Sequence, residues 1–216
     1  MAPTGTLEYL ADSLVPLRNA PVQARSTARL TALLDAAAAV VDEIGFERLT
    51  TAMVADRAGA SIGTVYRYFP DRIALLQALA SRNLERVLTR AADEIVDPRH
   101  ADWVEAMAAS FDVFAEAFRS EPGFRGLRVG DVIDLRPAAN ERPFNSIVAN
   151  RLLDGLISRF GVPDSDEIRL RFEAAIEVTD ALVARAFARD ARGDEAFLAV
   201  ARETSNSMLS EYFGAV

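Results

Sequence analysis

Hydrophobic positions recur every three or four residues along most of the chain, which is the spacing of helices that bury one face. In the first part of the chain this spacing predicts four helices. The first runs from Ser26 to Ile44 and is stopped by Gly45, the next two are short, and Asp71 caps the fourth. These helices are predicted at residues 26–44, 52–58, 61–68 and 72–93.

The second part of the chain has the same helical rhythm. An aromatic stripe from Trp103 to Phe118 begins it, and Ser165 and Asp194 are placed to cap the last two helices. Neither the alternation typical of strands nor an internal repeat is visible, so the predicted fold class is all-α. Helices are predicted at residues 103–118, 144–160, 166–191 and 195–212.

Two segments lack this regularity. Residues 1–24 hold three prolines and no sustained period, and we expect a flexible extension there with one short helical turn at Leu7–Leu14. Between Gly123 and Pro143, glycines and prolines surround a short apolar segment, Val129–Leu135. We expect one or two short helices and a flexible loop in this region.

The composition excludes several classes of protein. The 216 residues include no cysteine and one histidine, His100, which excludes disulfides, thiolate nucleophiles, iron–sulfur clusters and cysteine-bound zinc. No glycine-rich phosphate loop or nucleophile elbow is present, and Glu105, Asp112 and Glu116 are typical of a solvated helix face. We therefore expect no enzyme activity, no metal and no cofactor.

The sequence shows neither a signal peptide nor an apolar stretch of about 18 residues. We therefore expect no membrane association and a cytoplasmic location.

Charge is unevenly distributed along the chain. The formal net charge is −8, yet residues 1–90 hold 10 arginines and 9 acidic residues, whereas residues 91–216 hold 14 and 23. All 24 basic residues are arginines. A coding bias explains the absence of lysine, although the planar guanidinium group of arginine also suits contacts with phosphate and guanine. The acidity lies mainly in the second part, so it does not exclude a nucleic-acid partner for the first.

Residues 49–69 have the spacing of a helix-turn-helix, in which the second helix reads the major groove of DNA. The turn between the two short helices is Gly59-Ala60-Ser61. Glycine allows a positive φ, alanine is small enough to sit between crossing helices, and serine caps the following helix.

Helical geometry divides the second of these short helices into two faces. Val65 and Phe69 are placed to point into a three-helix core. The other face is expected to present hydroxyl, aromatic and guanidinium groups, which suit phosphate oxygens and base edges. The alternative is a short packing helix whose tyrosines fill gaps in the core. The residues expected toward solvent are Gly63, Thr64, Tyr66, Arg67 and Tyr68.

This segment resembles the N-terminal domain of the TetR family of transcriptional regulators. The resemblance covers about residues 26–90 and lies in the glycine turn, the run from Gly63 to Phe69 and the helix start at Pro70-Asp71-Arg72. The remaining chain matches the family only in length and helical content. The resemblance implies a helix-turn-helix DNA-binding domain at residues 25–90 and a helical ligand-binding and dimerisation domain at residues 91–216, after the extension at 1–24.

The resemblance also implies particular contacts with double-stranded DNA. Thr50 and Thr51 at the start of one helix, and Arg72 at the start of another, would contact phosphate. The short helix between them would contact the DNA backbone or bases. The candidate DNA-binding residues are Thr50, Thr51, Ser61, Ile62, Gly63, Thr64, Tyr66, Arg67, Tyr68 and Arg72.

Two positions depart from the family pattern. Ile62 stands where a long polar residue is common, so it either touches a thymine methyl group or packs. Ala52 lacks the reach of a base-reading side chain. Hydrogen-bonded readout is therefore expected to be sparse, with Arg67, Arg25 or Arg29 compensating.

By resemblance, the chain is expected to be a repressor that binds a palindromic operator as a homodimer and is released by a small, hydrophobic or aromatic effector. A regulator without such a ligand and a transcriptional activator are the alternatives. The last two helices are the expected dimer interface, unless their small and apolar faces pack only within the chain. The residues of these faces are Phe172, Ala175, Val178, Thr179, Leu182, Ala186, Ala201, Thr204, Ser205, Met208 and Leu209.

Aromatic residues are concentrated in the middle of the chain. They form either ordinary core or an apolar pocket with one or two polar anchors. Candidate anchors are His100, Asn145, Glu177 and Asp180. The candidate ligand-binding residues are Trp103, Met107, Phe111, Phe114, Phe144, Phe172 and Ile176.

Overall fold

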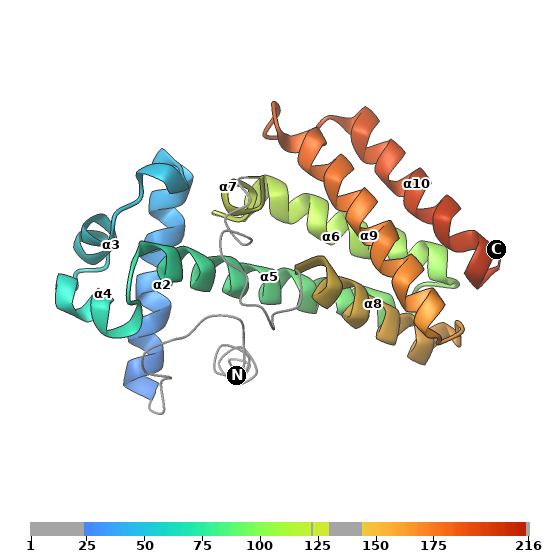
Figure 1. Cartoon of the computed structure of the whole chain (residues 1–216), viewed down its shortest axis with the longest axis horizontal. Helices are drawn as coiled ribbons and strands as arrows, with labels where there is room; N and C mark the ends of the chain where they lie inside the picture. Colours follow the sequence, from blue (N-terminus) through green and yellow to red (C-terminus); the bar gives the residue numbers. More distant parts are fainter. Residues whose placement is uncertain (1–23, 122, 130–143, 215–216) are drawn as a thin grey trace. The chain divides into compact units, whose positions relative to one another are not determined.

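The computed structural model describes residues 24–121, 123–129 and 144–214, in which every regular element is a helix (Figure 1). The all-α prediction is confirmed. The described residues form two compact units, residues 24–86 with 121 and 123–129, and residues 87–120 with 144–214. Residues 121 and 123–129 belong to the first unit, and the domain boundary expected at residue 90 stays a prediction.

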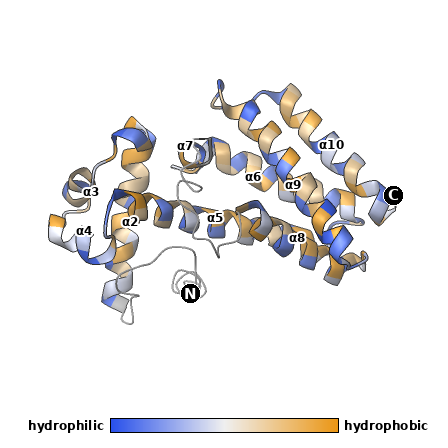
Figure 2. Ribbon diagram, viewed as in Figure 1, coloured by the Kyte–Doolittle hydropathy of each residue, from blue (hydrophilic) through white to orange (hydrophobic). Residues whose placement is uncertain are grey.

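The first unit is built around a long helix that is hydrophobic along most of its length (Figure 2). This helix, α2, buries Leu30, Leu33 and Leu34 and ends before Gly45, whose φ is +83°. The described elements of this unit are α2 (Ala24–Ile44), the 3-10 helix η1 (Phe46–Arg48), α3 (Thr51–Arg57), α4 (Ile62–Tyr68), the first part of α5 (Arg72–Val96) and α7 (Phe124–Val129).

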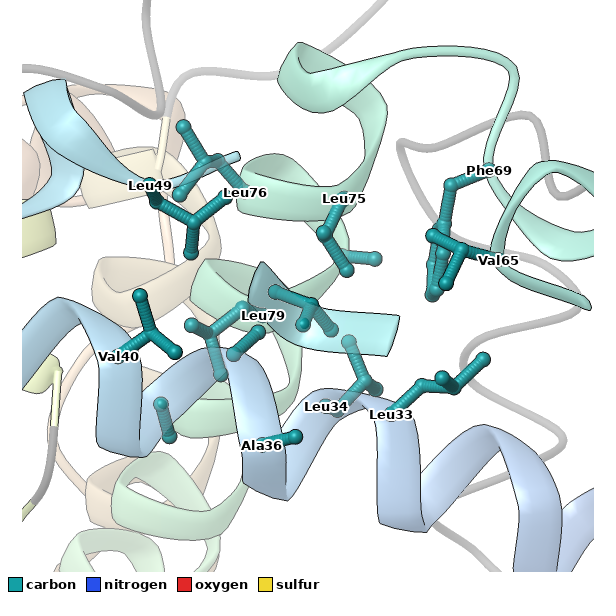
Figure 3. Close-up of a cluster of buried hydrophobic side chains, with 14 of the residues drawn as sticks. Leu33, Leu34, Ala36, Val40, Leu49, Val65, Phe69, Leu75, Leu76 and Leu79 are labelled. Carbon is teal, nitrogen blue, oxygen red and sulfur yellow. The ribbon is translucent and has the colours of Figure 1, made fainter. Parts of the chain in front are cut away.

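Residues from α2, α4 and α5 meet in one hydrophobic core. Val65 and Phe69 lie next to each other on the side of α4 that faces Leu33 and Leu75 (Figure 3). Both Val65 and Phe69 are completely buried, as their spacing predicts. This packing fixes the orientation of α4 and therefore determines which of its side chains face solvent.

A short helix, α7, completes this core. Its Leu127 is 1% exposed and belongs to the same hydrophobic cluster. At Gly123, just before α7, a Cβ atom would lie 3.5 Å from the Cα of Ala38 and the φ is +73°. Glycine therefore suits the close approach and the backbone turn at this point. One or two short helices are expected between Gly123 and Pro143, and α7 is one such helix among the described residues.

The second unit contains the end of α5 and four further helices. Ser165 Oγ accepts a hydrogen bond from Ile168 N at 3.3 Å, and Asp194 Oδ1 accepts one from Ala196 N at 3.0 Å, so both predicted caps are confirmed. The four helices are α6 (Trp103–Ser120), α8 (Phe144–Phe160), α9 (Asp166–Phe187) and α10 (Glu195–Phe213).

Two helix ends differ from the predictions. Helix α5 continues to Val96, beyond the expected end at Asp93. Helix α9 ends at Phe187 rather than near Ala191, because the Asp190 carboxylate accepts a hydrogen bond from Arg192 N at 2.8 Å and stabilises a turn instead.

Some expectations fall where the structure gives no description. The helical turn at Leu7–Leu14, the flexible extension and the loop after residue 129 lie outside the described residues. Within the described ranges, no helix combines the length and apolar character needed to cross a membrane.

Candidate nucleic-acid interface

The start of α3 brings two threonine hydroxyls to one place. Thr50 caps the helix, with Oγ1 accepting a hydrogen bond from Met53 N at 3.2 Å. Thr51 Oγ1 donates to the Tyr66 hydroxyl at 3.3 Å, which ties the start of α3 to α4. Hydroxyls at a helix N-terminus, beside free backbone N–H groups, are suited to contact a phosphate oxygen.

The turn between α3 and α4 follows the sequence prediction. Gly59 has a φ of +57° and Ala60 N donates to Ala55 O at 2.9 Å, which closes the end of α3. Ser61 Oγ then accepts from Thr64 N at 3.2 Å and caps α4. The predicted helix, glycine turn and capped second helix are therefore confirmed.

Helix α4 has one buried face and one exposed face. Ile62 and Tyr66, one turn apart, are 43% and 45% exposed. Gly63 and Arg67 are also exposed, and Thr64 is half-buried. These five residues form an outward surface on α4, which we call the α4 face.

Tyr68 does not belong to the α4 face, and its expected exposure is wrong. Its side chain is only 4% exposed. The hydroxyl lies 2.9 Å from Ser26 Oγ and donates to Ser26 O at 3.3 Å. Tyr68 is three residues beyond Val65 and therefore shares its buried side of the helix. Its role is to fasten α4 to the start of α2.

The arginines around the interface are in different electrostatic environments. Arg57 Nη2 donates to Glu43 Oε2 at 2.6 Å, and this hydrogen bond holds the pKa of Glu43 below its usual range. Arg82 is buried against Asp35 at 2.6 Å, and burial lowers the pKa of its guanidinium. Neither arginine is available for an outside anion.

Arg67 and Arg72 remain accessible. Arg67 is exposed, and among the described residues no carboxylate lies within ion-pair distance of it. Arg72 is exposed at the start of α5, where its Nη2 donates weakly to Phe46 O at 3.4 Å. Arg25 and Arg29 of α2 are exposed as well. The α4 face therefore carries a positive charge that a phosphate or a guanine can approach.

The candidate ligand-binding residues of the second unit divide into buried and half-buried groups. Trp103, Met107, Phe144 and Phe172 are buried, whereas Phe111, Phe114 and Ile176 are half-buried. Their role as ligand-binding residues stays a prediction.

Rings of the buried group contact the C-terminal helix. The centroid of Phe213 lies 5.4 Å from that of Trp103, edge-on, and 6.1 Å from that of Phe172. Trp103 Nε1 donates to Gly214 O at 3.3 Å. Phe111 differs, because the guanidinium of Arg202 lies 4.7 Å from its ring centroid. Core packing accounts for Trp103 and Phe172.

Three of the four candidate polar anchors come together between α8 and α9. Asn145 Nδ2 donates to Glu177 Oε2 at 2.8 Å and to Asp180 Oδ2 at 3.4 Å. His100 lies elsewhere, with Nε2 at 3.0 Å from Glu94 Oε2.

The structure also describes a groove of about 660 Å³ at the turn between α9 and α10. Charged residues make up most of its lining, and none of the predicted ligand-binding residues lines it.

Only part of the face expected on the last two helices points outward. Phe172, Ala175 and Ala186 of α9 are buried within the chain, as are Ala201, Ser205 and Leu209 of α10. These residues therefore pack inside the unit, because α9 and α10 lie side by side (Figure 1). Of the other expected residues, Val178 is exposed, and Thr179, Leu182, Thr204 and Met208 are half-buried. We call the exposed apolar positions of the two helices the α9–α10 face; they are Leu170, Val178, Ala181, Ala196, Ala199 and Val200.

A three-helix core that presents a capped, outward-facing helix after a glycine turn defines a helix-turn-helix DNA-binding protein. The comparisons with known proteins agree with this. Residues 33–79 match the family model described as bacterial regulatory proteins, tetR family, and residues 101–213 match the model of the tetracyclin repressor-like C-terminal domain. The chain belongs to the TetR family, whose members are transcriptional regulators rather than enzymes.

Individual relatives support this assignment. A TetR-family transcriptional regulator from Streptomyces coelicolor is 35% identical, with a TM-score of 0.72 over 87% of this chain and 98% of that chain. The repressor KstR of Rhodococcus jostii is 31% identical over 90 residues, which is 42% of this chain and 41% of KstR. The match therefore spans only about two fifths of the length of that relative. The repressor AlkX from a Dietzia strain is 18% identical with a TM-score of 0.60, covering 86% of this chain and 98% of that chain, and shows the fold alone.

Proposed function

We propose that this protein is a transcriptional repressor that binds a palindromic operator as a homodimer and is released by a small, largely hydrophobic effector. The observation that carries the proposal is the division of α4 into two faces. Val65 and Phe69 are completely buried, whereas Tyr66 and Arg67 face solvent on the opposite side. A helix held firmly by one face and polar on the other is suited to enter a major groove.

The neighbouring helix starts supply the contacts that position α4 on DNA. Thr50 and Thr51 at the start of α3, and Arg72 at the start of α5, offer hydroxyl, guanidinium and backbone N–H groups to phosphates. Tyr66 and Arg67 then face the bases or the flanking backbone. In this proposal, the helix starts position the protein on the DNA backbone, and α4 reads the base sequence.

A single helix-turn-helix makes too few base contacts for useful specificity, so we assign the α9–α10 face to a second copy of the chain. Leu170, Val178 and Val200 on this face are 67%, 39% and 47% exposed, and Ala181, Ala196 and Ala199 of the same two helices are exposed as well. Small and apolar side chains allow two helix pairs to pack closely across a two-fold axis. The two α4 helices would then meet half-sites about 34 Å apart.

Release by an effector requires that the effector bind the form of the dimer that does not fit DNA more tightly than the form that does. A switch from 1:99 to 99:1 requires about 5.5 kcal/mol of differential binding. In the second unit, the half-buried Phe111, Phe114 and Ile176 offer apolar contacts. Asn145, with Glu177 and Asp180, offers a polar anchor.

Selection of DNA fragments by the purified protein tests the proposal. Fragments of the source genome are incubated with the protein, and bound fragments are sequenced after several rounds. We expect one enriched sequence with two inverted half-sites centred about one helical turn apart. Enrichment of no sequence, or of a sequence without two-fold symmetry, would contradict the operator proposal.

A release screen on the recovered operator then tests the effector. Small apolar and aromatic compounds are added to the protein–operator complex, and displacement is followed by fluorescence anisotropy. A true effector must bind the free protein more tightly than the DNA-bound protein, because coupling is reciprocal. If no compound displaces the operator, the regulator without a small-molecule ligand becomes the better account.

A further inference from the structure

The first turn of α4 carries an isoleucine that the fold does not use. Ile62 is 43% exposed, although it directly follows the cap Ser61 in a unit with a well-filled core. The sequence leaves two alternatives for Ile62, packing or contact with DNA. Its exposure is not that of a core residue, since Val65 in the next turn is completely buried. Ile62 is therefore available to a partner.

Around Ile62, the first turn of α4 offers few hydrogen-bonding groups to a base. Gly63 has no side chain, and the Thr64 hydroxyl lies 2.9 Å from Ser61 Oγ, with which it hydrogen-bonds. In the first turn of α3, Met53 is also apolar and is 44% exposed. Readout of base edges by amide or guanidinium groups, as is common in the major groove, is therefore not possible from this turn.

Gly63 indicates that another surface approaches closely. Its φ lies outside the left-handed region, and among the described residues a Cβ atom there would meet nothing nearer than Ser61 Oγ at 3.8 Å. Neither the backbone nor the packing of the unit requires glycine at this position. A helix is weakened by glycine, so its presence is explained if the first turn of α4 lies against a partner that leaves no room for a side chain.

We propose that Ile62 recognises the C5-methyl group of one thymine in each operator half-site. The inference rests on the proposed function, since it assumes that the α4 face enters the major groove. The thymine methyl is the apolar group that base pairs present there. Burying it against Ile62 removes apolar surface of both partners from water, and Gly63 lets the helix approach closely enough for this contact.

Replacement of thymine by deoxyuridine tests the contact, because it removes only the methyl group and keeps the base pair. Each thymine of the recovered operator is replaced in turn, symmetrically in both half-sites, and the dissociation constant is measured by anisotropy. At one position per half-site we expect binding to weaken about three- to fivefold per methyl group lost, or about tenfold or more for the pair.

The variant Ile62→Ala assigns this discrimination to the side chain. It should bind the thymine operator more weakly than the wild type and bind the deoxyuridine operator with the same affinity as the thymine operator. Val96→Ala is the matched control, since Val96 is 47% exposed and lies at the end of α5 rather than on the α4 face. This control should keep the full preference for thymine. Equal thermal midpoints of the three proteins verify that the fold is intact.

The possible failures are distinguishable. If the wild type binds thymine and deoxyuridine operators equally at every position, or if Ile62→Ala keeps the preference, the Ile62 inference is wrong while the repressor proposal stands. If Ile62→Ala and the wild type both recover no operator in the selection, both proposals fall. A methyl preference that disappears only in Ile62→Ala supports the inference.

Discussion

Two tyrosines two residues apart show how differently neighbouring positions of one short helix are used. Tyr66 is 45% exposed and accepts a hydrogen bond from Thr51, whereas Tyr68 is 4% exposed and bonds to Ser26. We propose that the first contacts DNA, whereas the second holds α4 to α2. Removing the hydroxyl from each should therefore change a different property of the protein.

Tyr68→Phe should lower the free energy of unfolding by about 1 kcal/mol, because a part-buried hydrogen bond to Ser26 is lost. Tyr66→Phe should lower the free energy of unfolding by less than about 0.5 kcal/mol, because its hydrogen bond to Thr51 is exposed to solvent, and it should weaken operator binding. Urea unfolding and anisotropy titrations of both variants measure the two effects. The reverse pattern, with Tyr66→Phe destabilising and Tyr68→Phe defective only in binding, would contradict the orientation of α4.

At the residue scale, local caps were predictable and long-range partners were not. Ser61, Ser165 and Asp194 cap helices as predicted, because a cap depends only on residues two or three positions away. The burial of Tyr68 depends on Ser26, which is far away in sequence. The signal that could have found it is its spacing of three residues from Val65.

The helix-turn-helix is the element on which the proposed function depends, and its two glycines have different physical roles. Gly59 has a φ of +57°, and a Cβ atom at this position would meet no described atom within 4 Å, so only its backbone conformation requires glycine. Gly63 has an ordinary helical backbone and open space around it. Alanine should therefore affect the two positions in opposite ways.

Gly59→Ala should destabilise the first unit by about 1–2 kcal/mol, because alanine is strained in the left-handed region. Gly63→Ala should leave the stability unchanged or raise it by up to about 1 kcal/mol, since alanine favours helix, and should weaken operator binding. Thermal unfolding and operator titration of both variants test this. A Gly59→Ala protein as stable as the wild type would contradict the conformational role of Gly59. A Gly63→Ala protein with wild-type affinity would contradict the close approach of DNA at Gly63.

Helix faces were predicted less well than helix positions. The last two helices begin at the predicted caps, but six of the residues expected to join a second copy are buried inside the chain. Apolar residues occur on more than one side of α9 and α10, so periodicity alone does not tell which side meets α6 and α8 and which meets solvent. The packing of the whole unit decides this.

At the scale of the whole molecule, six of the seven large exposed hydrophobic side chains among the described residues lie on two surfaces, and the seventh is Val96. Among the described residues, Met53, Ile62 and Tyr66 lie on the helix-turn-helix, and Leu170, Val178 and Val200 lie on the α9–α10 face. Exposed apolar surface that gathers in this way is typical of binding sites. One surface is assigned to DNA and the other to a second copy of the chain.

Val178→Arg and Val200→Arg should weaken the dimer at least about tenfold, because each places an unpaired charge in the contact between copies. Operator affinity should fall in parallel, since a monomer contacts one half-site. Val96→Arg, at an exposed valine outside the α9–α10 face, should leave both properties unchanged. Sedimentation velocity over a concentration series measures the association. Dimers as stable as the wild type in both charged variants would exclude this face.

The operator affinity of Arg67→Ala, compared with Arg192→Ala, tests most directly whether the α4 face binds DNA. The two changes remove the same charge, but Arg67 lies on the α4 face and Arg192 lies at the turn between α9 and α10 with a side chain that is 90% exposed. We predict that Arg67→Ala loses about 1–3 kcal/mol of binding free energy and that Arg192→Ala binds like the wild type. Equal affinities of Arg67→Ala and the wild type would contradict the account.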